Sequence, residues 1–325
     1  MSCCIGIDIG GTNTVIGLIG PDGRIARRAK IATQAADGPD RILDRIAAQV
    51  NELLNESGMS KSSVAAIGMG VPGFIDHEQG IAVSSVNLHW KNVPVAEGIR
   101  QRLGIPAYIN NDVRMYVYGE AAQGAGKGFR HVLGVTVGTG LAAGVVSEGK
   151  LYHGGGNMAG ELGHIPLEGI PYTCNCGLTG CLETVASATG IVRQAMDRIR
   201  EGRPTVLRQW FSEETMSRMQ AKDISRAYDL GDEVAVEVMN TTGTYLGLGL
   251  AYAVTLFSPD VVIIGGGVAA AGERLLAPVR EAMKSRLIRN YWDRIRVVTA
   301  ELGDDAGVIG SGLYAKEREA FRRIQ

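Results

Sequence analysis

The chain has 325 residues, a formal net charge of −1, 45% hydrophobic residues and 21% charged residues. This composition is ordinary for a folded protein and excludes a disordered chain, and without basic runs nothing favours nucleic acid or an acidic membrane surface as a partner. The length favours two domains over a single core, so we expect a protein that acts on a small ligand.

Neither a membrane span nor an export signal is expected. The most apolar stretch, residues 246–257, is interrupted by two glycines and is shorter than the about 20 residues that cross a bilayer. The N-terminus enters a strand pattern without the basic and apolar regions of a signal peptide. We therefore expect a cytoplasmic protein with no membrane partner.

The first element is a strand, turn and strand pattern over residues 5–23, IGIDIGGTNTVIGLIGPDG. An apolar strand ends at Asp8, a glycine turn follows, and a second strand covers residues 14–19. Glycines let backbone amides approach phosphate oxygens, and a carboxylate beside phosphate needs a divalent cation, so the turn suits a metal nucleotide. The alternative is a plain hairpin whose glycines only make the bend. The candidate nucleotide contacts are Asp8, Gly10, Gly11, Thr12 and Asn13.

A second copy of this pattern, residues 134–149, implies an internal duplication. Its candidate nucleotide contacts are Gly138, Thr139 and Gly140. Two further pairs of segments recur in the same order: residues 64–73 with 261–268, and residues 105–110 with 295–300. Two related α/β units would then present two glycine turns to one ligand. This arrangement resembles the actin, hexokinase and Hsp70 superfamily, a ribonuclease H-like ATPase fold with two domains around a cleft.

Residues 39–54 carry apolar side chains at helical spacing and predict an amphipathic helix that covers a sheet. The strand at residues 64–69 then runs into GVPGFID, where Gly73 brings backbone to a cleft. In the following SSVNLHWKNVP, Asn87, His89 and Trp90 are candidates to face a polar ligand. The alternative is a loop with a core tryptophan, and a lone histidine is more often a surface or core residue.

The strand at residues 105–109 ends in Asn110, Asn111 and Asp112 before a helix. Asx residues suit helix caps, but one cap needs only one such residue. Ligands gather at the carboxyl ends of parallel strands, which is where these three residues lie. Asp112 is therefore a candidate base, and Asn111 is a candidate donor to the same hydroxyl-bearing ligand.

Between residue 150 and about residue 232, the second half carries an insertion with its own chemistry. Its candidate metal ligands are His164, Cys174, Cys176 and Cys181. Three thiolates and one imidazole are typical of structural Zn²⁺, although the Cys-x-Cys spacing is tighter than usual. The alternative is reduced, buried thiols, but a loop this rich in glycine has little apolar surface to hold it in place. We expect the metal to hold Glu161 and Glu183 toward one pocket.

Near the C-terminus, PDVVIIGGGV is an apolar strand that ends in Gly265, Gly266 and Gly267. We expect a helix to start there, so that backbone and helix dipole meet a nucleotide. A Rossmann interpretation lacks the required context, a position after the first strand of a unit and a following acidic residue. The last helix, residues 308–322, is expected to return to the first domain. We therefore place the domains at residues 1–116 with 306–325, and at residues 117–305.

Together these segments resemble the ROK family of sugar kinases and repressors, and within it the bacterial ATP-dependent glucokinase type. The resemblance covers nearly the whole chain through DIGGTN, GVPG, VNLHW, NND, VGTG, GELGH, CNCGLTGCLE and IGGGV. It implies that Asp112 is the catalytic base and that the two glycine turns hold phosphate and Mg²⁺. It also implies an adenosine site at residues 265–267. The implied sugar contacts are Gly73, Asn87, Asn111, Asp112, Glu161, His164 and Glu183.

The activity implied by this resemblance is transfer of the ATP γ-phosphoryl group to the C6 hydroxyl of glucose, in a homodimer or homotetramer. The chain departs from the family pattern at two places. Asn13 stands where the family commonly has lysine, which removes one charge near the phosphates. Val113, Arg114 and Met115 stand where the family usually has small residues and asparagine, which bears on the size of the sugar pocket.

Several alternatives stay open. The clustered donors do not separate glucose from N-acetylhexosamines, mannose or fructose, nor ATP from polyphosphate as the donor. A sugar-sensing transcription regulator of the same family would carry an N-terminal helix-turn-helix domain and a charge pattern that binds DNA. An actin-like filament protein is disfavoured by the metal loop and the paired glutamates.

Overall fold

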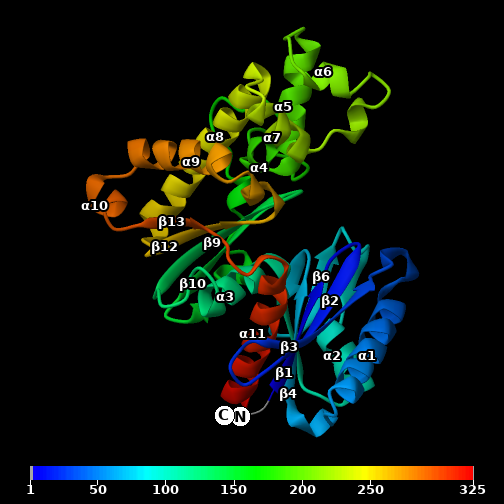
Figure 1. Ribbon diagram of the computed structural model, residues 1–325. Helices are drawn as coiled ribbons and strands as arrows, with labels where there is room; N and C mark the ends of the chain where they lie inside the picture. Colours follow the sequence, from blue (N-terminus) through cyan, green and yellow to red (C-terminus); the bar gives the residue numbers. More distant parts are fainter. Residues whose placement is uncertain (1–2, 325) are drawn as a thin grey trace. The chain divides into compact units, whose positions relative to one another are not determined.

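The computed structural model describes residues 3–324, so that residues 1, 2 and 325 of the predicted domains lie outside the described part. The chain forms two compact units (Figure 1). The N-terminal unit comprises Met1–Phe129, Gly144–Ala159 and Glu301–Gln325, and the C-terminal unit comprises Arg130–Ala143 and Gly160–Ala300. The predicted domain boundaries after residues 116 and 305 stay a prediction, because compactness does not establish which parts fold alone.

A five-stranded sheet with the order β3-β2-β1-β4-β8 forms the centre of the N-terminal unit. Its strands are β1 (Cys3–Ile9), β2 (Asn13–Ile19), β3 (Ile25–Ala32), β4 (Val64–Val71) and β8 (Ala107–Asn111). The antiparallel pairing of β1 with β2 confirms the first predicted hairpin. Because β1, β4 and β8 run parallel, their carboxyl ends lie at one edge of the sheet.

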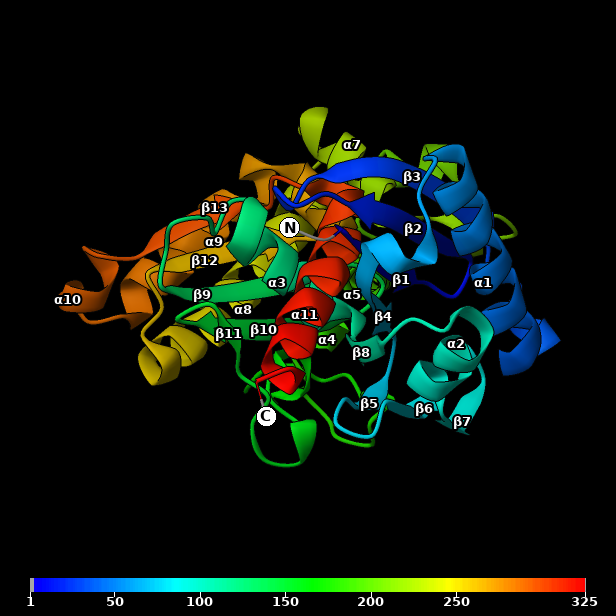
Figure 2. The same ribbon diagram turned by 90° about the horizontal axis from the view of Figure 1, so that it is seen from below.

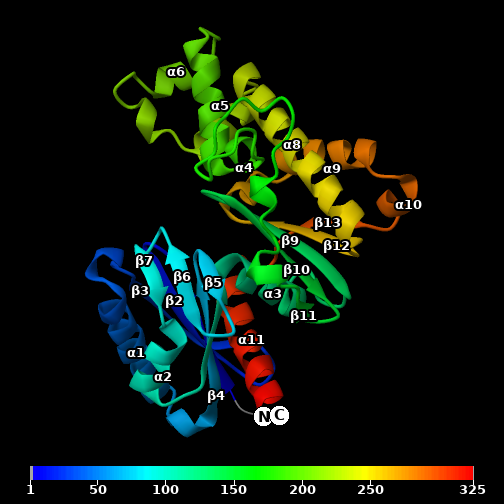
Figure 3. The same cartoon turned by 180° about the vertical axis from the view of Figure 1, so that it is seen from behind.

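Helices α1 (Pro39–Glu56) and α2 (Val95–Leu103) belong to the apolar core on one face of this sheet. Side chains alternate along β1, so that Ile5, Ile7 and Ile9 all enter this core. The apolar stripe that predicts α1 is buried in the same core and consists of Ile42, Ile46, Val50 and Leu53. Figures 1 and 3 show α1 and α11 (Ala306–Arg322) on opposite faces of the sheet.

On the other face, α3 (Asp112–Gln123) and α11 pack with backbone against backbone. A Cβ on Gly6 of β1 would lie 1.9 Å from a carbonyl oxygen of α11, and one on Gly68 of β4 would lie 1.7 Å from another. A Cβ on Gly310 of α11 would lie 1.8 Å from the carbonyl oxygen of Met115 in α3. Only glycine therefore allows these two helices to approach the sheet and each other this closely.

Residues 74–93 form a smaller antiparallel sheet, for which the sequence predicts only a loop. Its strands are β5 (Phe74–Asp76), β6 (Ile81–Ser85) and β7 (Trp90–Val93), and Figure 2 shows them beside α2. Trp90 is buried in the apolar core of the unit, so the prediction that it faces a polar ligand is wrong and the alternative interpretation of this segment holds for this residue. Asn87 and His89 are exposed between β6 and β7, and His89 has a left-handed φ of 56°.

The second sheet has the order β11-β10-β9-β12-β13. Its strands are β9 (His131–Val137), β10 (Leu141–Ser147), β11 (Lys150–Leu151), β12 (Val261–Gly265) and β13 (Arg296–Thr299). The predicted repeat of the first hairpin corresponds to β9 and β10, which confirms the duplicated strand and turn pattern. The boundary between the two units falls within β10, at Gly144.

The helices of the C-terminal unit include α8 (Glu233–Phe257) and α9 (Glu273–Arg286), which lie side by side (Figure 3). The shorter helices are α4 (Glu183–Ala186), α5 (Ala188–Arg200), α6 (Leu207–Trp210), α7 (Ala221–Asp229) and α10 (Arg289–Trp292). The 3-10 segments of the chain are η1 (Ala35–Asp37), η2 (Lys61–Ser63), η3 (Gly155–Asn157), η4 (Leu162–His164), η5 (Met216–Arg218), η6 (Gly267–Ala271) and η7 (Gly303–Asp305). Within residues 3–324, no helix combines the length and apolar character that a bilayer crossing requires.

Two predicted element ends are wrong. β8 does not break at Asn110 but continues to Asn111, because its parallel pairing with β4 extends to that residue. Gly265, Gly266 and Gly267 do not start an α-helix: they lead into the 3-10 segment η6, and α9 begins only at Glu273. An α-helix dipole therefore does not act at these glycines.

Two histidines stack inside the N-terminal unit. The ring centroids of His77 and His153 lie 3.8 Å apart with an angle of 18° between the planes. Burial lowers the pKa of His153 to about 4, with help from the neighbouring His77, Arg114 and Arg318. Burial likewise lowers the pKa of His77, and Arg318 and Arg114 act in the same direction. Both rings are therefore neutral at neutral pH, which suits a stack with two arginines nearby.

Acid should destabilise the protein through this stack. The pKa of His153 is about 4 in the folded protein and 6.5 for an ordinary histidine, so the unfolded chain binds more protons between these values. The free energy of unfolding therefore falls as the pH falls from about 6.5 toward 4. His153→Phe keeps an aromatic ring without a titrating group, so its thermal midpoint should fall less than that of the wild type. Equal pH dependence of the two midpoints would contradict this account.

Candidate active site

The carboxyl ends of β1, β4 and β8 gather the predicted acidic and amide side chains of the N-terminal unit. Asp8 of β1 pairs with Gly70 of β4, which in turn pairs with Asn110 of β8. Asp112 follows as the first residue of α3, and a Cβ on Gly70 would lie 3.3 Å from its Cα. Parallel pairing thus brings the two predicted carboxylates to one edge of the sheet, and Gly70 leaves room for α3 to start there.

Asp8 lies in an acidic environment. Burial, with smaller contributions from the carboxylates of Asp112 and Asp304, raises the pKa of Asp8 to about 7. Its carboxyl carbon lies 2.9 Å from the place of a Cβ on Gly307, in the first turn of α11. A divalent cation bound here would relieve the repulsion between these carboxylates. The sequence does not predict a role for Asp304, and the only available signal was the acidic pair in GDDAG before the last helix.

Asn111 is the cap of α3, and Asp112 is not. The Asn111 side-chain oxygen accepts a hydrogen bond from the amide of Arg114 at 3.2 Å. Asp112 Oδ1 accepts a hydrogen bond from the amide of Val113 at 2.9 Å. Burial raises the pKa of Asp112, and hydrogen bonds from backbone and from Asn111 partly oppose this shift. Because Asn111 already caps the helix, capping does not explain the presence of the Asp112 carboxylate.

Thr33 fixes the first glycine turn through hydrogen bonds. The sequence does not predict a role for this residue. The Gly10 amide donates to the carbonyl of Asn13 at 2.9 Å and closes the turn. The Thr33 hydroxyl donates to the carbonyl of Gly10 at 2.7 Å, and its amide donates to the carbonyl of Thr12 at 2.9 Å. Gly11, Thr12 and Asn13 are exposed on the outer side of the turn, where a phosphate can reach them.

Two further predicted sugar contacts lie close to these elements. A Cβ on Gly11 would lie 3.4 Å from the carbonyl oxygen of Asn87, so Asn87 lies beside the first turn. Gly73 has a φ of 107°, and a Cβ there would lie 2.1 Å from the carbonyl oxygen of Ser84, so only glycine fits. The Gly73 carbonyl accepts a hydrogen bond from Asn111 Nδ2 at 3.1 Å. The structure therefore groups Gly73, Asn87, Asn111, Asp112 and Asp8 in the N-terminal unit.

In the C-terminal unit, the second glycine turn is fixed by the start of α5. The amide of Gly138 donates to the carbonyl of Gly140 at 2.9 Å. The Gly138 carbonyl accepts from the amide of Ala188 at 2.7 Å, and the Thr139 carbonyl accepts from the Thr189 hydroxyl at 3.1 Å. A backbone hydrogen bond thus closes each turn, across three residues in the first and two residues in the second. The second turn is held by the start of α5, where the first is held by Thr33.

Glu183 lies against this second turn. Its Oε2 accepts a hydrogen bond from the amide of Leu141 at 2.8 Å and lies 2.7 Å from the place of a Cβ on Gly140. One carboxylate oxygen of this predicted sugar contact is therefore bonded to the start of β10. This hydrogen bond fixes the Glu183 side chain. The backbone of Glu183 lies two residues after Cys181, one of the predicted metal ligands.

A cavity of about 1080 Å³ adjoins the second turn, and its size suits a small organic ligand. Gly138, Thr139 and Gly267 are the predicted nucleotide contacts that line it. Gly265 is the last residue of β12. A Cβ on Gly266 would lie 2.5 Å from a carbonyl oxygen of β9, so glycine at this position allows close packing against that strand. The sequence offers no motif for the lining side chains from the insertion, which include Tyr172, Arg193, Met196, Arg200, Gln220 and Lys222.

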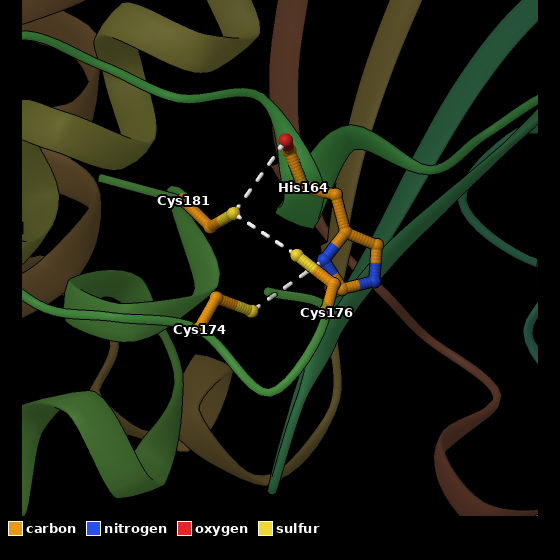
Figure 4. A group of neighbouring side chains, drawn as sticks. All are labelled: His164, Cys174, Cys176 and Cys181. Carbon is orange, nitrogen blue, oxygen red and sulfur yellow. Dashed lines mark hydrogen bonds between the residues drawn. The ribbon is translucent and has the colours of Figure 1, made fainter. Parts of the chain in front are cut away.

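The four predicted metal ligands come together in the C-terminal unit (Figure 4). The potential ligand atoms of His164, Cys174, Cys176 and Cys181 all lie within 4.8 Å of one another. Cys174 Sγ lies 3.7 Å from His164 Nδ1, and Cys176 Sγ lies 3.5 Å from Cys181 Sγ. A tetrahedral zinc with bonds of about 2.3 Å places its ligand atoms about 3.8 Å apart. The donor set and its spacing therefore fit Zn²⁺.

A short hairpin accommodates the tight Cys-x-Cys spacing. The Cys174 amide donates to the carbonyl of Leu178 at 2.8 Å, and the Gly177 amide donates to the carbonyl of Cys174 at 3.0 Å. Cys174 and Cys181 are buried, whereas Cys176 is exposed at the tip. A hydrogen bond from the Leu178 backbone lowers the pKa of the Cys176 thiol, and burial raises the pKa of Cys181. Thiolate formation is thus easier at Cys176 than at Cys181.

His164 presents its second ring nitrogen to Glu161. The His164 Nε2 lies 3.9 Å from Glu161 Oε2, while Nδ1 faces the thiols. The positions of Glu161 and His164 depend on the glycine at residue 163. A Cβ at this residue would lie 2.1 Å from the carbonyl oxygen of Leu141. Glycine at this position lets η4 pack directly on the start of β10. The structure therefore groups Glu161, His164 and Glu183 in the C-terminal unit.

Comparison with known proteins decides the family. The ROK family matches residues 4–318. The chain belongs to the ROK family. It is 36% identical over 318 residues to a glucokinase of Halalkalibacterium halodurans, covering 97% of this chain and 95% of the relative. This confirms the family resemblance of the sequence motifs.

Two solved ROK structures share the fold. A ROK family glucokinase from Streptomyces griseus in complex with glucose and AMPPNP is similar with a TM-score of 0.79 and 33% identity, covering 97% of this chain and 99% of that one. A ROK family transcriptional regulator, a homologue of the Escherichia coli MLC protein, is similar with a TM-score of 0.85 and 26% identity, covering 98% and 78%. These similarities confirm the predicted actin and hexokinase type of α/β fold.

Replacing Gly163 by alanine should destabilise this ROK protein. The new Cβ would overlap the Leu141 carbonyl oxygen at 2.1 Å, so η4 must shift. Overpacking of this kind lowers the free energy of unfolding by about 1–3 kcal/mol, which denaturant unfolding measures. Gly155→Ala is the matched control, because nothing lies within 4 Å of a Cβ at Gly155. Similar stability of the two variants would contradict the proposed packing.

Proposed function

We propose that this ROK protein is an ATP-dependent sugar kinase that transfers the γ-phosphoryl group to the C6 hydroxyl of glucose. The observation that carries the proposal is the position of Asp112. It lies beside Asp8 at the carboxyl ends of the parallel strands, and it is not used as a helix cap. The glucokinase relative of Halalkalibacterium halodurans and the Streptomyces griseus complex with glucose and AMPPNP support the choice of substrates.

In the proposed reaction, Asp112 accepts the proton of the attacking hydroxyl while the hydroxyl oxygen forms its bond to the γ-phosphorus. The bond to the β-phosphate oxygen breaks, and its electron pair leaves with ADP. Burial raises the pKa of Asp112, and a raised pKa makes a carboxylate a better proton acceptor. Positioning of the two reactants supplies most of the acceleration.

The phosphate groups are assigned to the two glycine turns. The contacts are Gly10, Gly11, Thr12 and Asn13 in the first turn and Gly138, Thr139 and Gly140 in the second. Asp8 is assigned to Mg²⁺, which when bound offsets phosphate charge. Because Asn13 carries no charge, the turn amides and the cation neutralise more of the phosphate charge here than a lysine at this position would require. The base and ribose of ATP are assigned to the cavity that Gly267 lines.

The sugar hydroxyls are assigned to Asn87, Asn111, Glu161, His164 and Glu183, with a backbone contact at Gly73. Each of these side chains carries donors or acceptors that suit a polyhydroxylated ligand. His164 has two tasks in this proposal, because one ring nitrogen faces the thiols and the other faces Glu161. A metal bound to Nδ1 would fix the ring and direct Nε2 toward the sugar.

A structural Zn²⁺ is proposed at His164, Cys174, Cys176 and Cys181, supported by the fit of the four ligand atoms. Its chemistry is to cross-link a hairpin that has little apolar surface of its own. We also propose a cytoplasmic homodimer or homotetramer without a nucleic-acid partner, which the near-neutral charge supports.

Assays of ADP release across aldoses, ketoses and amino sugars test the proposed activity. Glucose should give the largest kcat/KM with ATP. A preference for N-acetylhexosamine, mannose or fructose would retain the reaction and correct the acceptor, and polyphosphate in place of ATP tests the donor. No sugar-dependent release from metal-replete protein would overturn the proposal and favour a sugar-sensing regulator.

Asp112→Asn should lower kcat by about 10²–10⁴ if the carboxylate is the general base. Asparagine keeps the shape of the side chain and the hydrogen bond from Val113 but does not take up the proton. Steady-state rates with glucose and ATP measure the effect. Asp44→Asn is the matched control, because Asp44 pairs with Arg102 on the surface of the same unit. Near-normal turnover of Asp112→Asn would reject the base.

Purified protein should contain about one zinc per chain by elemental analysis. Cys181→Ser removes a buried ligand, so it should lose the metal, lower the thermal midpoint and raise the KM for sugar. Cys3→Ser is the control, because Cys3 lies in β1 of the N-terminal unit and is not one of the four clustered residues. Metal-free wild-type protein with full stability would defeat the zinc assignment and leave the sugar-kinase proposal to the activity assay.

A further inference from the structure

Arg114 in α3 is a buried cation that holds a separate segment of the chain. Its side chain is 4% exposed, and its Nη2 donates hydrogen bonds to the carbonyls of Asn157 at 2.6 Å and Ala159 at 2.8 Å. A buried guanidinium needs such partners, because its desolvation is costly unless its donors are satisfied. The two carbonyls therefore have to stay in place around the side chain.

The segment that Arg114 holds has little rigidity of its own. Residues 154–159 read GGGNMA, and Gly154, Gly156 and Asn157 have positive φ values of 69°, 62° and 60°. Two backbone hydrogen bonds close it, from Met158 to Gly155 at 3.3 Å and from Ala159 to His153 at 3.1 Å. Glycines lose much conformational freedom when they are ordered, so this segment, here called the glycine strap, depends on contacts from outside.

Arg114 also joins the strap to the predicted base and to the GVPG loop. Its own amide donates to the side-chain oxygen of Asn111, whose Nδ2 donates to the carbonyl of Gly73. Asp112 lies two residues before Arg114, at the start of the same helix. Hydrogen bonds therefore connect Gly73, Asn111, Arg114 and the strap within one unit.

We propose that Arg114 is a positioning residue for the acceptor sugar. Arg114 fixes the carbonyls of Asn157 and Ala159, and Ala159 lies two residues before Glu161. Arg114 thereby sets the path of the chain that leads into Glu161. The inference rests on the proposed function, because it assumes that Glu161 binds a sugar hydroxyl. It also gives a role to the departure from the family pattern after NND: the Arg114 side chain is directed to the strap carbonyls.

The geometry favours arginine over lysine at this position. The guanidinium is more weakly hydrated than an ammonium group and so is less costly to bury, and its rigid planar shape holds Nη2 against both carbonyl oxygens. Lysine carries its donors on a single flexible nitrogen and is more costly to bury without a close partner. Arg114→Lys should therefore keep part of the effect, and Arg114→Met, which keeps much of the apolar length, should lose all of it.

The first test is the effect on KM values. Arg114→Met should raise the KM for sugar about 10- to 100-fold, because small misplacements of substrate contacts have effects of this size. The KM for ATP should change by less than about twofold, since no nucleotide contact is assigned to the strap. Arg102→Met is the matched control: Arg102 donates to the carbonyl of Gly98 and to two surface aspartates in the same unit. It should leave both KM values unchanged.

The second test does not depend on activity. Hydrogen exchange of the peptide that spans residues 150–160 should become faster in Arg114→Met, to a smaller extent in Arg114→Lys, and not in Arg102→Met. If Arg114→Met does not fold, Arg114→Lys carries both tests.

The outcomes separate the inference from the function on which it rests. A larger KM for sugar together with faster exchange in the strap supports the inference. An active wild type whose variants keep the KM for sugar, or keep exchange in the strap unchanged, overturns it. A wild type with no sugar-dependent ADP release overturns the proposed function, whatever the exchange data show.

Discussion

The contact on which the N-terminal site depends is the approach of α11 to the sheet and to α3, which glycine alone permits. Gly6, Gly68 and Gly310 meet carbonyl oxygens at distances that no Cβ could occupy. This packing gathers the start of α11 and the start of α3 at the ends of β1 and β4. A chain with larger residues at these positions would have to move both helices, and the two aspartates at these ends would separate.

Close packing has an electrostatic consequence. Asp8 ends up beside Asp112, Asp304 and the first turn of α11, and burial among these groups raises its pKa to about 7. Such a site is unfavourable when empty and favourable for a cation, which matches the demands of a magnesium nucleotide. At the same edge the carboxylate of Asp112 is not used as the helix cap, because Asn111 has taken that role. The same close packing therefore causes both the repulsion between the carboxylates and the preference of this site for a cation.

Local patterns in the sequence predict much of the fold and the grouping of residues at the candidate site. The first hairpin, its repeat, α1 and the Cys and His metal set all follow from short spacings, because turn chemistry, helical periodicity and ligand type are written in neighbouring residues. Thr33, Asp304 and the cavity side chains from α5 and α7 could not be found this way, because each reaches its place through tertiary packing and no motif marks it. The helix expected at Gly267 failed because a 3-10 segment precedes α9.

The most direct test of the central claim is a crystal structure of the protein with glucose and a non-hydrolysable ATP analogue. The account predicts an Asp112 carboxylate oxygen within about 2.6–3.2 Å of the glucose O6 atom, with phosphate oxygens against the amides of the first glycine turn. A carboxylate directed away from O6, or a first turn without phosphate, would contradict it.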